Sequence, residues 1–258
     1  HEYHGYVDIS MPGYEERALH QFQHPHPKRK QHAPHAWQPP KVGQKVQFCD
    51  DDDDSPHLPM SATKRAQQIV GTFLYYALAL DFTMLVTLGS ISQQTNAPTE
   101  YTMSEIVWFL DYCATHPDAT IRYTASDMHL WTSSDASYLS EPNSKSRAGG
   151  FYFLGDKPQY QSKDALTTET APLNTPTPNG PVHVLAKIMS NIMSSAMEAE
   201  VGAAFLVARD ACPLRVTLEE LGHPQTPTPL KVDNTTAVGF ANGRIRHKRS
   251  KAIDMRFH

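Results

Sequence analysis

The hydrophobic period changes once along this chain, and that change constrains the fold more than any other feature of the sequence. From residue 61 to about residue 116, apolar side chains recur with the period of an α-helix. After the turn HPDA at 116–119, the pattern switches to short extended runs that are typical of β-strands. We therefore expect a mostly helical first half and a second half that contains a sheet.

Start signals and one apolar stretch define the helical half. Ser61 and Asp81 are expected to cap its first two helices, and the T-x-x-E box of Thr102 and Glu105 predicts the start of the third. The stretch 69–91 is apolar enough to suggest a membrane span, but it carries Asp81, and a charge near the bilayer centre is costly. We therefore predict two helices of a water-exposed module and no membrane partner.

The extended half gives a defined order of elements. The runs IRYTA, MHLWTSS, GGFYFLG and PVHVLAK predict three or four successive strands. A helix is expected over about 194–220, followed by the strand PLKVDN and the short helix TTAVGFANG. The order β-β-β-α-β-α is typical of an α/β fold with a mixed sheet.

A polar segment separates the N-terminal residues from the helical half. Residues 21–60 are rich in Pro, His, Gln and Lys and include five consecutive Asp at 50–54. We interpret this segment as a linker or surface loop; weak metal binding is the alternative, although its histidines lack a fixed ligand spacing. The expected domains are an N-terminal fragment with a disordered His/Pro-rich and acidic loop (1–60), a helical module (61–120) and the α/β domain (121–258).

Three acids of the α/β half are placed where strands and a helix could bring them together: Asp135, Asp233 and either Glu198 or Glu200. At about 100° per residue, Glu200 lies in the middle of the apolar face of the predicted helix. Glu198 falls on the opposite side, where we expect a solvated acid. Burying Glu200 without a partner would be costly, so a positive group is expected beside it.

The other two acids are each expected at the end of a strand. If these strands are adjacent and parallel, Asp135 and Asp233 lie side by side near Glu200, and such an all-oxygen set suits a hard cation such as Mg²⁺. The alternatives are that Asp135 begins a turn, that Asp233 caps the following helix, and that Glu200 pairs with a buried Arg or Lys. The neighbours of Asp135 are small and would leave room for a hydrated metal and a phosphate: Ser134, Ala136 and Ser137.

The C-terminal residues are basic in a chain whose formal net charge is −4. The last fifteen residues hold six Lys or Arg against one Asp. Clustered cations beside an acidic metal site are what a polyanion-binding protein needs, and Lys145 and Arg147 could add to this surface. The alternative is an exposed charged helix.

Several ordered motifs resemble the ribonuclease H domain of copia-type retrotransposon polyproteins: SDASYLSE, RAGGF, SSAMEAEVGAAF, KVDNTTAV and KRSKAIDMRFH. The earlier segments DISMPGYEERAL, QQIVGTFLYYALALDFTMLV and LDYCATHPDATIRY resemble the connection between the polymerase palm and ribonuclease H in the same polyproteins. The resemblance covers nearly the whole chain apart from residues 21–60.

The resemblance implies a ribonuclease H-like mixed sheet flanked by helices and preceded by a mostly helical connection module. It implies hydrolysis of the RNA strand of an RNA–DNA hybrid during reverse transcription, with two Mg²⁺ or Mn²⁺ ions. Asp135, Glu200 and Asp233 are then the catalytic, metal-binding carboxylates. The residues expected to contact nucleic acid are Asn234, Arg246, Lys248, Arg249 and Lys251. Asp254, in the Lys-rich I-D motif, is a further candidate on the substrate side or in a structural role.

Two departures from the family pattern qualify these expectations. Family members carry a fourth carboxylate in an A-D-x-x-T-K segment after one more strand, whereas this sequence stops at His258. We therefore expect the final strand and helix to be missing, and a catalytically decayed fragment that binds nucleic acid or a protein partner is the alternative function. FCDD at 48–51 imitates the Y/F-x-D-D hairpin of reverse transcriptases, but more Asp and SPH follow it, so we expect no polymerase active site.

The remaining expectations concern partners and location. The expected partners are an RNA–DNA hybrid and the remainder of the retroelement polymerase. We expect no signal peptide at the start of the chain, and its three widely spaced cysteines suit a reducing compartment. An intracellular location is expected, in a cytoplasmic particle or the nucleus.

Overall fold

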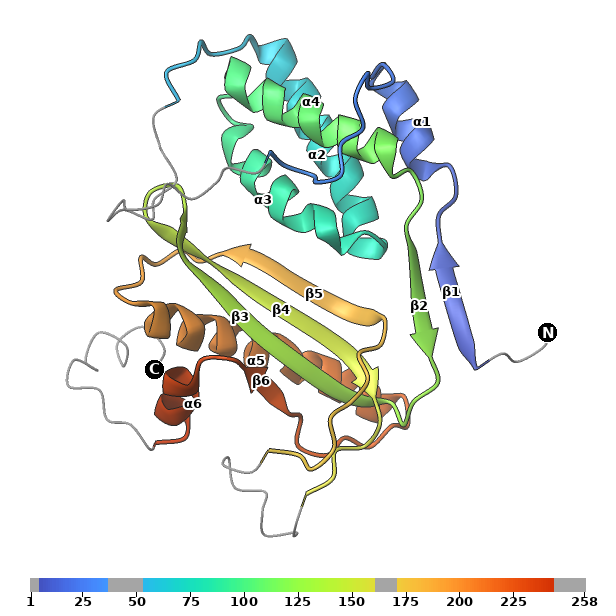
Figure 1. The fold of residues 1–258 in the computed structure, drawn as a ribbon, viewed down its shortest axis with the longest axis vertical. Helices are drawn as coiled ribbons and strands as arrows, with labels where there is room; N and C mark the ends of the chain where they lie inside the picture. The colour runs from blue at the N-terminus through green and yellow to red at the C-terminus, as the bar shows by residue number, and fades with distance from the viewer. Residues whose placement is uncertain (1–4, 37–52, 161–170, 244–258) are drawn as a thin grey trace. The chain divides into compact units, whose positions relative to one another are not determined.

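The computed structural model describes residues 5–36, 53–160 and 171–243. The chain divides into two compact units, one of residues 1–7 and 122–258 and the other of residues 8–121. Each unit has its own buried apolar residues (Figure 1).

The unit of residues 8–121 is built from helices, as the sequence period predicts. Its elements are α1 (Tyr14–Gln21), α2 (Met60–Ala79), the 3₁₀ helix η1 (Phe82–Met84), α3 (Leu85–Gln94) and α4 (Glu100–Thr115). Helices α2 and α4 meet through Phe73 and Phe109, whose rings pack edge to face with centroids 5.3 Å apart. Short strands β1 (Tyr6–Ser10) and β2 (Thr120–Thr124) pair in a two-stranded sheet.

The apolar stretch 69–91 is divided among α2, η1 and α3. Asp81 stands at the division and accepts a hydrogen bond from the Thr83 backbone N–H at 3.1 Å, so it caps the next helix as predicted. Among the described residues, no helix combines the length and the apolar content that crossing a membrane requires.

Two helix starts differ from the predicted ones. Helix α2 begins at Met60, one residue before the predicted cap Ser61. Helix α4 is capped by Thr99, whose hydroxyl accepts from the Thr102 N–H at 3.2 Å while the Thr102 hydroxyl accepts from the Thr99 N–H at 3.1 Å. The predicted box of Thr102 and Glu105 is therefore wrong, because Thr102 already lies inside the first turn.

The described part of the predicted N-terminal loop, residues 22–36, is bonded to helices of its unit. His24 Nε2 lies 2.7 Å from Asp111 Oδ1, and the Trp108 indole N–H donates to the Ala33 carbonyl at 3.0 Å. These contacts correct the expectation of a disordered segment as far as residue 36. Residues 37–52 lie outside the described part of the chain.

The second unit contains a four-stranded mixed sheet of β3 (His129–Glu141), β4 (Lys145–Gly155), β5 (Pro181–Ile188) and β6 (Leu230–Val232). The strand order is β5-β4-β3-β6; β4 is antiparallel to both its neighbours and β6 is parallel to β3. Helices α5 (Ala196–Glu220) and α6 (Thr235–Ala241) complete it. The predicted α/β class, the mixed sheet and the order of elements are confirmed.

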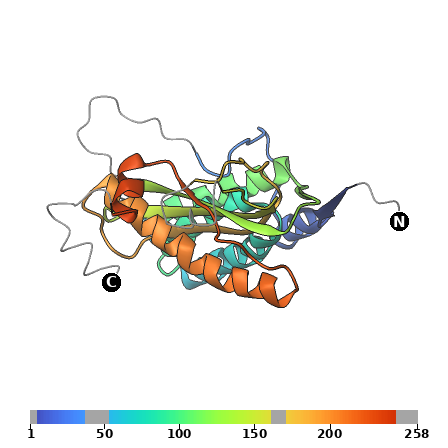
Figure 2. The same cartoon turned by 90° about the horizontal axis from the view of Figure 1, so that it is seen from below.

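Helix α5 runs along one face of this sheet (Figures 1 and 2). The shared core contains Leu130, Tyr152, Val207, Ala211 and Leu218. A Cβ atom added at Gly150 would lie only 2.8 Å from Val207 Cγ2, so glycine is what allows the helix to approach the strand this closely. Close packing of α5 fixes the position of every side chain that it presents to the sheet.

Candidate metal centre

Asp135 lies in the middle of β3, opposite Gly149 of β4. The sequence placed it at the end of a strand, and the structure corrects this because the hairpin with β4 carries β3 on to Glu141. The parallel pairing with β6, however, stops one residue earlier, at Ser134 and Val232. Asp135 is therefore exposed where its shorter neighbour ends.

Asp233 directly follows Val232, the last residue of β6. Strands β3 and β6 are parallel and Ser134 pairs with Val232. Asp135 and Asp233 are therefore the residues that directly follow this pair along the chain. The side-by-side placement predicted from two adjacent parallel strands is thus what the register produces. Asn234 follows and caps α6, its side-chain oxygen accepting from the Thr236 and Ala237 N–H groups at 3.0 Å each.

Glu200 projects from the second turn of α5, a helix that Ser195 caps. Only 7 % of the residue is exposed, and its Oε2 is buried with no hydrogen-bond partner among the described residues. The prediction that Glu200 lies on the buried face of the helix is confirmed. No ion pair to Glu200 occurs within the described residues, so the alternative of a buried cationic partner has no support there.

Glu198 is also buried, which corrects the expectation of a solvated acid. Its carboxylate accepts from the Ser194 N–H at 2.7 Å and from the Ser194 hydroxyl, while the Ser195 hydroxyl accepts from the Glu198 N–H at 3.1 Å. Glu198 therefore supplies a hydrogen-bond acceptor to the residues at the start of α5. The Glu198 carboxylate is thus occupied by hydrogen bonds from Ser194, whereas Oε2 of Glu200 has no hydrogen-bond partner among the described residues.

The three carboxylates of Asp135, Glu200 and Asp233 meet. One oxygen from each lies within 4.8 Å of the others, so among the described residues these three side chains form a group that could hold a metal ion. Asp135 and Asp233 are exposed and Glu200 is buried, so the trio opens to solvent on one side. The structure thus brings together the acids that were predicted to converge.

Electrostatics at the trio favour a proton or a cation. Burial, and after it the charges of Asp135 and Asp233, raise the pKa of Glu200 from its ordinary 4.5 to about 7, although the Ala136 N–H acts to lower it. The same N–H donates to Asp135 Oδ1 at 2.8 Å. Three mutually repelling carboxylates, one of which has a buried oxygen without a donor among the described residues, fit a hard divalent cation with water as its other ligands.

Two of the small neighbours of Asp135 take part in packing. Ser134 is buried, and Ala136 packs against the cluster of Ala148, Ala199 and Ala203 beneath α5. The small side chain of Ala136 thus lets the helix approach the strand, and the expectation that these neighbours leave room for metal and phosphate stays a prediction. Ser137 is exposed and its hydroxyl lies 2.6 Å from that of Ser140.

The predicted basic surface is described only in part. Arg147 is buried and its Nε donates to Glu141 Oε1 at 2.6 Å, so it does not add to an exposed cationic patch as expected. The tail residues assigned to nucleic acid or the substrate side lie outside the described residues: Arg246, Lys248, Arg249, Lys251 and Asp254.

The structure buries another acid that the sequence patterns did not single out. Glu15, in α1 of the helical unit, is fully buried, and desolvation raises its pKa to about 8 while Tyr76 and Cys113 lower it. Its spacing of three and four residues from the buried Ala18 and Leu19 is the signal that could have placed it on the inner face of the helix.

The raised pKa of Glu200 has a consequence for stability that can be measured. Because Glu200 has a higher pKa when folded, the folded metal-free chain binds more protons than the unfolded chain between about pH 4.5 and pH 7. Its contribution to the free energy of unfolding is therefore full below that window and is lost as the pH rises through about 7. Thermal unfolding in EDTA is expected to show this decline in the wild type and a flatter profile in Glu200→Gln. Parallel profiles for the two chains would contradict a raised Glu200 pKa.

The site is thus defined by three carboxylates that β3, α5 and the residue after β6 bring together. Comparison of the chain with protein-family models, with curated proteins and with solved structures gave no match.

Proposed function

We propose that residues 122–258 form a ribonuclease H-like, metal-dependent endonuclease domain of a copia-type retrotransposon polyprotein. It hydrolyses the RNA strand of an RNA–DNA hybrid. The observation that carries the proposal is the meeting of Asp135, Glu200 and Asp233 within 4.8 Å. These are the acids of the motifs SDAS, EAE and VDN, in that order along the chain.

The fold supports this proposal at the level of architecture. A mixed sheet in which β6 lies parallel beside β3, with α5 across one face, agrees with the arrangement that the resemblance implies. The helical unit of residues 8–121 would be the connection module of the same polyprotein. Within the domain, the β3–β4 hairpin and α5 hold Asp135 and Glu200 through a packed core, which suits a site that must keep its geometry.

Asp135, Glu200 and Asp233 would hold Mg²⁺ or Mn²⁺, and two ions are expected in a complete site. Bound ions of this kind activate a water molecule and stabilise the leaving oxygen of a phosphodiester. The chain's own contribution is to hold the three carboxylates together. The buried Glu200 must give up its proton near neutral pH, because burial and two neighbouring charges raise its pKa to about 7.

Other parts of the proposal concern the substrate and the setting. Asn234, beside Asp233, and the cationic residues of the C-terminal tail would contact the hybrid. The other proposed partner is the remainder of the retroelement polymerase. The proposed location is intracellular, in a cytoplasmic particle or the nucleus.

A cleavage assay with three duplexes tests the proposal. We expect the 258-residue chain to cut the labelled RNA strand of an RNA–DNA hybrid in Mg²⁺ or Mn²⁺, to leave RNA–RNA and DNA–DNA duplexes intact, and to stop in EDTA. Hybrid binding that weakens steeply with salt, without cleavage in either metal, would overturn the nuclease assignment. That outcome would instead indicate a catalytically decayed, nucleic-acid-binding fragment.

A further inference from the structure

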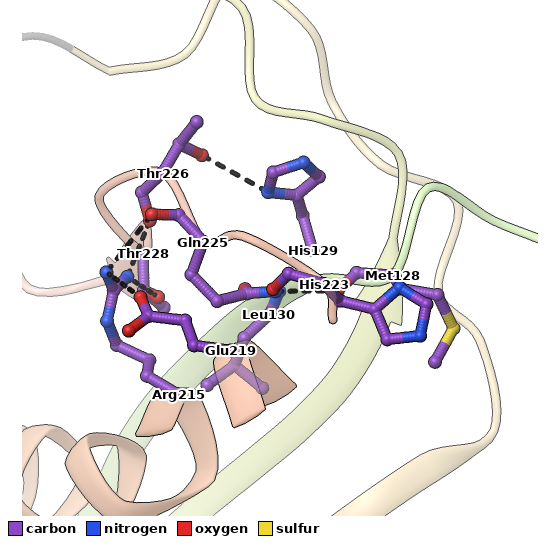
Figure 3. Close-up of polar contacts among 9 residues, drawn as sticks. All are labelled: Met128, His129, Leu130, Arg215, Glu219, His223, Gln225, Thr226 and Thr228. Carbon is purple, nitrogen blue, oxygen red and sulfur yellow. Dashed lines mark hydrogen bonds and ion pairs between the residues drawn. The ribbon is translucent and has the colours of Figure 1, made fainter. Parts of the chain in front are cut away.

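A polar network far from the acids holds the segment that leads into β6. Arg215 lies about four turns beyond Glu200 on α5. Figure 3 shows its guanidinium pointing at the segment after the helix. Its Nη1 donates to the Thr226 carbonyl at 2.5 Å and to the Thr228 hydroxyl at 2.7 Å, and its Nη2 donates to the Gln225 carbonyl at 3.4 Å. One side chain thus bonds three residues of this segment, two through main-chain carbonyls and one through a hydroxyl.

Gln225 ties the same segment to the start of β3 (Figure 3). Its Nε2 donates to the Met128 carbonyl at 2.9 Å, and its Oε1 accepts from the Leu130 N–H at 2.9 Å. The amide therefore pairs with both kinds of main-chain group, as a neighbouring strand would. Thr226 adds a contact of its hydroxyl with His129 Nδ1 at 3.3 Å.

The segment 222–229 has few main-chain N–H groups that could form hydrogen bonds within it. It contains Pro224, Pro227 and Pro229, which have no N–H to donate, and it forms no helix or strand between Gly222 and Pro229. Its last residue does reach β3: the Pro229 carbonyl accepts from the Thr132 N–H at 3.1 Å and from the Thr132 hydroxyl at 3.0 Å. The position of Pro229 then decides which residues of β6 face which residues of β3.

The register of β6 has one other support among the described residues, the packing of Val232 beside Met197 of α5 and Ala237 of α6. The strand is three residues long, and its pairs with β3 are Thr132–Leu230, Ser133–Lys231 and Ser134–Val232. A slip of one residue turns every side chain of a strand to the opposite face. Such a slip would carry Asp233 away from Asp135 and Glu200.

We propose that Arg215 and Gln225 are positioning residues that place Asp233 in the metal centre by fixing the segment 225–229 and hence the register of β6. The inference rests on the proposed function, because it assigns a purpose to the convergence of the three acids. Arginine suits the role, since its planar fork of donors can reach several acceptors at once. The nearby Glu219, 3.7 Å from Arg215 Nη2, holds the guanidinium from the other side.

The test compares two arginines of the same helix. Arg215→Met keeps the aliphatic part of the side chain and removes the guanidinium. Arg209→Met is the matched control, because Arg209 is half exposed and its guanidinium bonds the neighbouring Asp210 at 2.8 Å and 2.9 Å. Mn²⁺ affinity is measured by titration, and the waters on bound Tb³⁺ are counted from its luminescence lifetimes in H₂O and D₂O.

We expect Arg215→Met to weaken Mn²⁺ binding by about 10-fold, the lower range for residues that orient metal ligands. Bound Tb³⁺ should gain about one water, as in Asp233→Asn, because one carboxylate is lost to the ion. Arg209→Met should match the wild type. Arg215→Lys, which keeps a donor without the fork, should recover part of the affinity.

Three results decide the matter. A lower melting temperature for Arg215→Met with unchanged Mn²⁺ affinity and Tb³⁺ lifetime would overturn the positioning role and leave the metal centre intact. A wild-type chain that binds neither ion would overturn both the metal centre and this inference. If Arg215→Met does not fold, Thr228→Val, which removes one acceptor of the guanidinium, should give a smaller shift of the same kind, and no shift would overturn the inference.

Discussion

Asp135→Asn is expected to lower the rate of RNA-strand cleavage by more than about 100-fold, the upper range for changes that leave every ligand in place. Asparagine keeps the shape of the side chain and removes its charge, so a cation would lose one of three anionic ligands. Single-turnover cleavage of a labelled hybrid measures the effect. The control is Asp156→Asn, which removes an exposed carboxylate just beyond β4.

Stability separates this loss from simple misfolding. Asp135 repels Glu200, so Asp135→Asn should unfold at the same temperature as the wild type or higher in EDTA. The stabilisation that Mn²⁺ gives the wild type should shrink in this variant, since the stabilisation by a ligand grows with the logarithm of its concentration divided by its Kd. Cleavage at the wild-type rate by Asp135→Asn would contradict the assignment of this trio as the catalytic site.

Tyr152→Ala should have the largest effect on stability, a loss of about 3–5 kcal/mol in the free energy of unfolding of the sheet-containing unit. Tyr152 is fully buried between the sheet and α5, and its hydroxyl donates to the Val207 carbonyl at 3.2 Å. Removing the ring would leave a cavity in the contact that holds Glu200 in place. The matched variant Tyr152→Phe keeps the ring and should cost about 1 kcal/mol.

Urea unfolding followed by the fluorescence of Trp131 measures both variants. Trp131 lies in β3 of the same unit, and Trp37 and Trp108 are replaced by Phe so that the signal reports this unit alone. A cost for Tyr152→Ala close to that of Tyr152→Phe would contradict the close packing of α5 on the sheet.

The features that could be predicted from the sequence are those that repeat along it. The spacing of apolar residues along the sequence located the strands and α5. Helical geometry then placed Glu200 on the buried face, because residues one turn apart define that face. The expectation that Asp135 and Asp233 meet needed only that β3 and β6 be adjacent and parallel. A shared register then brings the next residues of both strands together.

Features that depend on partners distant in sequence could not be predicted in this way. Glu198 lies on the outer side of the predicted helix, yet it is buried, and Ser194, four residues earlier, donates hydrogen bonds to its carboxylate. The position of Arg147 in the alternating pattern suggests an exposed side chain, but the side chain is buried together with that of Glu141 across the hairpin. The length of β3 also follows from its partner β4, which continues the pairing past Asp135. None of these contacts produces a periodic pattern in the sequence.

The bonds of Arg215 and Gln225 belong to the same class. Their acceptors and donors lie in an irregular, proline-containing segment and at the start of β3, so no spacing rule links them. Only the three-dimensional arrangement shows that they converge on the approach to β6 (Figure 3).

The three ligands differ greatly in the amount of structure that must open to release them. Asp135 and Glu200 belong to a long hairpin and a long helix, so freeing either requires disruption of the packed core. Asp233 follows a three-residue strand at the edge of the sheet, and such edges open locally at a small fraction of the global unfolding free energy. A cation at this site would therefore exchange through fluctuations of one short edge, while the rest of the domain stays folded.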